Sequence, residues 1–176
     1  MNIISTQYNL PLKTFEIYLS GCKGKYFNNS KTRQHCNGCH NAESWNFKSG
    51  QDWQSHYQDK IKPTLSLSKQ SNLLKNIWIL GGEPLDQDPR ELYTLLNNLK
   101  QNYPDTKLWL WTGYSLEWVL SSPQYKEVLK FIDYIKVGHF DIDNKSSHYI
   151  QQFDITLQSD QELFEVINES FLEQIL

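Results

Sequence analysis

Short apolar segments, most of them ended by a glycine-containing turn, recur along this chain. In residues 15–19 apolar and polar positions alternate, as in a β-strand with one face in the core. Residues 76–80 form a nearly continuous apolar run, which is typical of a strand covered on both faces. Similar segments cover residues 107–111, 134–137 and 155–157. The pattern therefore predicts about five strands.

Helical periodicity is clearest after the second of these strands. Asp88 is suited to cap a helix with Pro89 at its first position. The apolar face of that helix would consist of Leu92, Leu95, Leu96 and Leu99. We expect further helices over residues 52–60, 115–120, 124–131 and 160–175, with polar connections over residues 23–35 and 62–70.

Strands that alternate with helices predict an α/β fold with a mainly parallel sheet. About five strands are too few for a closed barrel of eight, so the expected architecture is an open, partial (β/α) barrel. A chain of 176 residues is long enough to bury one core, and we expect residues 1–176 to form a single domain.

The turns that follow four of the predicted strands carry the most unusual sequence. They are the segment that begins at Cys22, then Gly81-Gly82-Glu83, Thr112-Gly113-Tyr114 and Gly138-His139. The carboxyl ends of parallel strands lie at one edge of a sheet, where such folds bind ligands. The sequence therefore predicts one cleft that collects all four turns.

Charge and composition narrow the classes of partner. The chain has 17 basic and 20 acidic residues, and its lysines are scattered, which is unlike a nucleic-acid-binding surface. The N-terminal segment lacks the features of a secretory signal, and no window approaches the roughly 18 apolar residues of a membrane span. We expect a cytoplasmic protein that binds neither nucleic acid nor a membrane.

Three cysteines are the strongest chemical signal. Cys36 and Cys39 have C-x-x-C spacing, and Cys22 ends a predicted strand. In a reducing compartment this pattern favours metal or redox chemistry over structural disulfides. Three thiolates would hold a 4Fe–4S cluster with one iron open to a ligand. The alternatives are a zinc knuckle completed by His35 or His40, and structural thiols.

Several other residues have both a functional and a structural interpretation. In Gly81-Gly82-Glu83-Pro84 the glycines would let a ligand approach the backbone, and Glu83 would bind a cationic group such as an amine. His139 could face the cleft or be a loop residue. A further set is expected to be structural: Asp86 and Asp88 as helix caps, Asp141 and Asp143 in a solvated turn, and Trp109 and Trp111 in the core or, less commonly, lining a groove.

Four motifs, taken together, resemble one family. Y-L-S-G-C ends at Cys22, H-C-N-G-C-H-N-A-E-S-W-N-F covers residues 35–47, W-I-L-G-G-E-P-L-D-Q covers residues 78–87 and L-W-L-W-T-G-Y covers residues 108–114. The chain resembles, over residues 15–140, the activating proteins of anaerobic ribonucleoside-triphosphate reductase. That family belongs to the radical S-adenosylmethionine (SAM) superfamily and generates glycyl radicals.

The resemblance implies a site and an activity. Cys22, Cys36 and Cys39 would ligate a 4Fe–4S cluster whose fourth iron is chelated by the amine and carboxylate of SAM. The SAM-binding residues would be Gly38, His40, Gly81, Gly82, Glu83, Thr112 and Tyr114, with no catalytic residue beyond the cluster ligands. The partner would be a glycyl-radical enzyme, the anaerobic reductase, with a low-potential electron donor such as flavodoxin.

The chain departs from the family pattern before Cys36. Thirteen residues, 23–35, separate the first two cysteines, where the family usually has three. A longer loop costs only logarithmically more entropy to close, so a cluster remains feasible. Some 7-carboxy-7-deazaguanine synthases also have a long first interval, which leaves a small-molecule radical SAM enzyme as one alternative and a non-catalytic zinc-knuckle module as another. The sequence assigns no role to residues 23–35.

Overall fold

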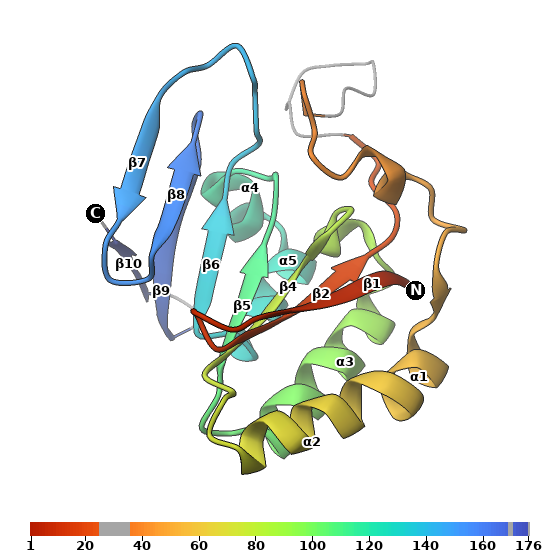
Figure 1. Ribbon diagram of the computed structural model, residues 1–176. Helices are drawn as coiled ribbons and strands as arrows, with labels where there is room; N and C mark the ends of the chain where they lie inside the picture. Colours follow the sequence, from red (N-terminus) through yellow and green to blue (C-terminus); the bar gives the residue numbers. More distant parts are fainter. Residues whose placement is uncertain (25–35, 169–170, 176) are drawn as a thin grey trace.

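The protein is described by a computed structural model that covers residues 1–24, 36–168 and 171–175. Its centre is an eight-stranded sheet with the strand order β10-β9-β6-β5-β4-β2-β1-β3 (Figure 1). These strands are β1 (Asn2–Asn9), β2 (Thr14–Leu19), β3 (Gln51–Asp52), β4 (Asn76–Gly81), β5 (Lys107–Trp111), β6 (Tyr134–Val137), β9 (Glu162–Asn168) and β10 (Phe171–Ile175).

The four central strands, β2, β4, β5 and β6, are parallel, as the sequence predicted. Antiparallel strands flank them: β1 and β3 beside β2, and β9 and β10 beside β6. The α/β class is therefore confirmed, and the sheet is open and mixed. The expectation of about five strands is wrong. The described residues also form β1, β3, β9 and β10 in the main sheet, and β7 (Ser147–Ile150) pairs with β8 (Ile155–Gln158), the strand expected at residues 155–157, in a second sheet.

The main helices pack on one face of the sheet. They are α1 (Trp53–His56), α2 (Lys62–Gln70), α3 (Pro89–Asn102), α4 (Leu116–Ser121) and α5 (Pro123–Glu127). Their buried side chains form one core with alternate residues of the central strands, such as Ile79 and Leu110. The other strand face carries Trp78 and Trp109, which pack with Ile155 from β8. Among the described residues, no helix is both long enough and apolar enough to cross a membrane.

The helix that contains α1 and α2 is longer than expected. Its two parts are joined by a π-helical turn, Tyr57–Ile61, so the expected polar connection over residues 62–70 is wrong. Trp53, Tyr57, Ile61 and Leu65 recur every four residues and are all buried, which places them on one helical face. The π turn ends two residues before Pro63, whose missing N–H cannot join a regular helical ladder.

The expected helix over residues 160–175 is also wrong. The segment forms β9 and β10, and β9 pairs antiparallel with β6 from Glu162↔Val137 to Glu165↔Tyr134. Leu163 and Phe164 are buried on opposite faces of the sheet. The apolar spacing of this segment suits a helix or a strand, and the unpaired edge of β6 selects the strand.

Candidate metal centre

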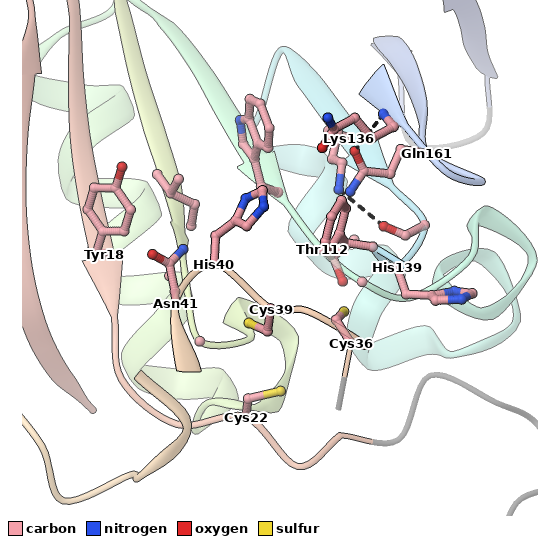
Figure 2. Close-up of a pocket in the computed structure, with 18 of the residues that line it drawn as sticks. Tyr18, Cys22, Cys36, Cys39, His40, Asn41, Thr112, Lys136, His139 and Gln161 are labelled. Carbon is pink, nitrogen blue, oxygen red and sulfur yellow. Dashed lines mark hydrogen bonds between the residues drawn. The ribbon is translucent and has the colours of Figure 1, made fainter. Parts of the chain in front are cut away.

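A cavity of about 390 Å³ opens at the edge of the sheet where the four parallel strands end. The turns after β2, β4, β5 and β6 all reach it, so the structure brings together the four turns that the sequence singled out (Figure 2). Its lining includes Cys22, Cys36, Cys39, His40, Gly81, Gly82, Thr112, Lys136, Gly138 and His139.

Cys22 is buried and held by its backbone. Its N–H donates to the Trp45 carbonyl at 3.1 Å, and the N–H of Gly21 donates to the Ser44 carbonyl at 2.6 Å. Gly21 has a φ of 102°, and a Cβ there would lie 2.1 Å from the Phe47 ring. Both the backbone conformation and the packing against Phe47 therefore disfavour any side chain at residue 21.

Cys36 and Cys39 share one tight turn. The Cys39 N–H donates to the Cys36 carbonyl at 3.2 Å, and Gly38 between them has a φ of 73°. Burial raises the pKa of the Cys36 thiol, and a hydrogen bond from the Phe140 backbone opposes that shift. Both thiols reach the pocket that Cys22 also lines.

The three thiols surround a space. Figure 2 shows Cys22, Cys36 and Cys39 around one end of the pocket, with Cys22 on the segment after β2 and the other two on one turn. Within the ranges that the structure describes, no three Cys, His, Asp or Glu side chains are close enough to hold a single metal ion. The three thiols line one cavity of about 390 Å³, and cysteine thiolates are the usual ligands of iron–sulfur clusters. Of the two histidines considered as a fourth zinc ligand, His40 lines the pocket, and His35 lies outside the described residues.

The two glycines of the Gly81-Gly82-Glu83-Pro84 turn pack directly against the turn that leads to Cys22. The Gly82 N–H donates to the Leu19 carbonyl and the Glu83 N–H to the Gly21 carbonyl, both at 2.8 Å. A Cβ on Gly82 would lie 2.4 Å from the Gly21 oxygen. The absence of side chains at this turn thus permits backbone-to-backbone contact that fixes the approach to Cys22.

Glu83 is buried behind the pocket wall, and its carboxylate accepts three hydrogen bonds from the protein. The donors are the Thr112 hydroxyl at 2.7 Å, the Gly113 N–H at 2.8 Å and the Leu85 N–H at 3.0 Å. Burial, together with the nearby Asp86 carboxylate, raises the pKa of Glu83 to about 7, although these three bonds lower it. The carboxylate therefore ties the end of β4 to the end of β5.

The remaining sequence-predicted residues divide between the pocket and the core. Thr112 and His40 line the pocket, and the His40 ring centre lies 4.6 Å from that of Phe140. Tyr114 lies in the core beside the site: its ring packs 4.4 Å from Trp118, and its hydroxyl donates to Asp86 at 2.7 Å. Burial raises the pKa of Tyr114, so this hydroxyl remains a donor.

The aspartates, tryptophans and histidine that the sequence analysis also considered lie in different environments. Asp88 caps α3, as expected, by accepting from the N–H groups of Arg90 and Glu91. Asp86 does not cap that helix, because it is buried and accepts the Tyr114 hydroxyl. Trp109 lies in the core, as expected, and Trp111 lines the pocket. His139 also lines the pocket, with its ring directed away from the three thiols in Figure 2.

Sequence reasoning missed Lys136 and Gln87. Lys136 is a buried cation in the pocket wall whose Nζ donates to the Gly138 carbonyl at 3.1 Å. Burial lowers its pKa to about 8, although the nearby Cys36 and Glu83 raise it. The Gln87 amide lies within 3.0–3.1 Å of the carbonyl oxygens of Ser20, Gly21 and Glu83. A lone charge in an apolar strand could have revealed Lys136. Gln87 ends the motif over residues 78–87, but its role depends on contacts with distant residues.

Comparison with known proteins identifies the family. The family model described as a 4Fe–4S single cluster domain matches residues 16–163. The chain is 29% identical to the anaerobic ribonucleoside-triphosphate reductase-activating protein of Enterobacteria phage T4, over 71% of this chain and 69% of that protein. It is 32% identical to the protein of the same name from Pasteurella multocida, over 61% of this chain and 68% of that protein.

A third relative of that name, from Escherichia coli K12, is 27% identical over 76% of this chain and 79% of its own length. No solved structure matches this fold significantly. The matched span contains the three cysteines and the four strand-end turns that line the pocket. The chain, which matches the 4Fe–4S single cluster domain over residues 16–163, therefore belongs to the family of anaerobic ribonucleoside-triphosphate reductase-activating proteins.

Proposed function

We propose that this protein is a radical SAM enzyme that generates a glycyl radical on an anaerobic ribonucleoside-triphosphate reductase. One observation carries the proposal: Cys22, Cys36 and Cys39 line one cavity at the carboxyl edge of the parallel strands, in a chain whose relatives are activating proteins. The open sheet with a parallel centre supports the partial barrel expected of such enzymes.

The three thiolates would ligate three irons of a 4Fe–4S cluster, which leaves one iron for the amine and carboxylate of SAM. Such a cluster, when bound and reduced, would supply the electron for reductive cleavage of SAM to methionine and a 5′-deoxyadenosyl radical, and that radical would take a hydrogen atom from a glycine of the partner. A low-potential donor such as flavodoxin would supply that electron.

The residues of the pocket wall would bind and orient SAM. Gly82 and Glu83 would contact its methionine end, and Gly38 and His40 would lie against its adenosine part. Gly81, Thr112 and Tyr114 complete the proposed SAM-binding set. Of these seven residues, the pocket lining includes His40, Gly81, Gly82 and Thr112. In the structure Glu83 holds Thr112 and Gly113 in place, and Tyr114 packs behind them.

The proposal predicts that anaerobically purified protein contains iron and sulfide and, after reduction, forms 5′-deoxyadenosine and a glycyl radical on the reductase. Cys36→Ala removes one of three ligands, so cluster content and radical yield should fall at least about tenfold. His148→Ala changes an exposed residue of β7 and should leave both unchanged. Iron analysis, product chromatography and electron paramagnetic resonance measure these quantities.

Other outcomes would contradict the proposal in distinct ways. Colourless protein with one zinc per chain would favour the non-catalytic zinc-knuckle module. If 5′-deoxyadenosine forms with a small substrate and no radical appears on the reductase, a small-molecule enzyme such as a 7-carboxy-7-deazaguanine synthase is supported instead.

A further inference from the structure

The turn that carries Cys36 and Cys39 is hydrogen-bonded to the loop that follows β6. The Asn37 side-chain amide donates to Asp141 Oδ1 at 3.0 Å and to Asp143 Oδ2 at 2.8 Å. Between those carboxylates, the Ile142 N–H donates to the Asn37 carbonyl at 3.1 Å. One residue between two cysteines thus makes three hydrogen bonds to one short segment, residues 141–143.

Packing reinforces this contact at the neighbouring residue. A Cβ on Gly38 would lie 2.8 Å from Cβ of Ile142, so the isoleucine occupies the space that a side chain would need. Ile142 nevertheless remains 48% exposed, because its contact is with the cysteine turn at the surface. Segment 141–143 therefore holds the turn through polar bonds at Asn37 and apolar contact at Gly38.

Segment 141–143 is itself hydrogen-bonded to the connection between β8 and β9. The Asp141 N–H donates to the Ser159 hydroxyl oxygen at 2.9 Å, and that hydroxyl donates to the Asp141 carbonyl at 2.8 Å. The Asn144 amide donates to Asp160 at 3.0 Å. Ser159 and Asp160 connect β8 to β9, so the cysteine turn is tied to two strands of the scaffold through Asn37.

The long interval before Cys36 gives this connection its importance. With a short interval, chain connectivity alone would keep Cys36 near Cys22. With thirteen intervening residues that restraint is weak, and the relative position of the thiols must come from tertiary contacts. We propose that Asn37, Asp141 and Asp143 are positioning residues that hold Cys36 and Cys39 in register with Cys22 for cluster binding.

This inference rests on the proposed cluster, and polarity reversal tests it. In Asn37→Asp a carboxylate would face two carboxylates, so we expect the reconstituted cluster to be lost to a chelator about five- to tenfold faster than in the wild-type protein. In the triple variant Asn37→Asp, Asp141→Asn, Asp143→Asn the donors and acceptors are exchanged, so most of the retention should return. Visible absorbance with iron and sulfide analysis measures the rate.

A matched control separates cluster retention from folding. Asn102→Asp removes an exposed amide that donates to the Asn98 carbonyl on α3, far along the chain from the cysteines, and should retain the cluster normally. Thermal unfolding of the cluster-free proteins should be similar for all variants. If Asn37→Asp does not fold, Asn37→Ser tests the same loss without added charge.

The outcomes distinguish this inference from the proposed function. If the wild-type protein binds a cluster and Asn37→Asp retains it equally well, the positioning role is refuted while the activase proposal stands. Failure of the triple variant to recover also refutes the role, because a general structural defect would then explain the loss. If the wild-type protein binds no cluster, both proposals fail.

Discussion

Glu83 is a buried carboxylate with three protein donors, which gives its ionisation a measurable effect on stability. Its pKa is raised from 4.5 to about 7, chiefly by burial, so the folded chain holds this proton more tightly than the unfolded chain. Raising the pH between those two values therefore favours unfolding. The contribution of Glu83 to stability should decrease from about pH 4.5 to about pH 7 and stay constant above.

Comparison with Glu83→Gln isolates this effect. The variant has no ionisable group there, so the cluster-free wild-type protein should lose more stability than the variant between pH 5 and pH 8, on the order of 2 kcal/mol. Urea unfolding at the two pH values measures the difference. Glu117→Gln, at an exposed position of α4, should behave like the wild-type protein. Equal losses in the wild-type protein and Glu83→Gln would show that the carboxyl is not protonated on folding.

The ammonium group of Lys136 is buried between its own strand end and the pocket. Its ammonium donates to the Gly138 carbonyl and lies 5.6 Å from the centre of the Trp111 ring, so a buried cation has both a hydrogen-bond acceptor and an aromatic face. It is also the cation that faces the pocket from β6, beside the Cys36 thiol. Its surroundings thus place a positive charge where thiolates would accumulate negative charge.

At the scale of elements, Gln87 joins the ends of β2 and β4. Its amide reaches two carbonyls of the turn after β2 and one of the turn after β4. Because the group is buried, its loss would leave carbonyl oxygens without donors in a region that water does not reach.

Gln87→Ala should therefore lower the free energy of unfolding by about 2 kcal/mol. Gln87→Glu should cost more, since a carboxylate would face three carbonyl oxygens. Gln101→Ala, at an exposed position of α3, should change stability little. Chemical denaturation of the cluster-free proteins tests the order, and equal stability of the two alanine variants would contradict it.

At the scale of the whole molecule, strand position should decide how firmly each part is held. β4 and β5 are paired on both sides and covered on both faces, whereas β3 and β10 form the edges of the sheet. Amide hydrogen exchange should therefore be slowest in β4 and β5 and fastest in the edge strands. Exchange in β10 as slow as in β5 would argue against this sheet order.

Much of the scaffold could be predicted from the sequence because its central strands end at distinctive turns. The strands now seen at β2, β4, β5 and β6, and the Asp88-capped helix, follow from local apolar patterns. The helical segment from residue 53 is longer than its apolar pattern predicts, because only one residue in four is large and buried and the others are mostly polar. The C-terminal strands could not be predicted, since the free edge of β6, which selects them, appears only in three dimensions.

The candidate site divides in the same way. Its cysteines and glycines are marked by spacing, so they could be identified locally. The roles of Gln87, Asn37 and Asp141 depend on partners that lie up to 106 residues away in the sequence, and no local pattern encodes such contacts. For Tyr114 the local motif was misleading. The motif suggested that this residue lines the pocket, but the fold directs its side chain into the core.

The carboxyl ends of the four parallel strands are cross-linked in series. Gln87 links β2 to β4, Glu83 links β4 to β5, and the Thr112 N–H donates to the Lys136 carbonyl of β6 at 2.8 Å. A wall braced in this way is preorganised, so a cofactor that docks there loses little affinity to ordering the protein. Any change of cavity shape to fit a different ligand would then occur mainly in the cysteine-bearing turns. Those turns would therefore determine most of the ligand specificity.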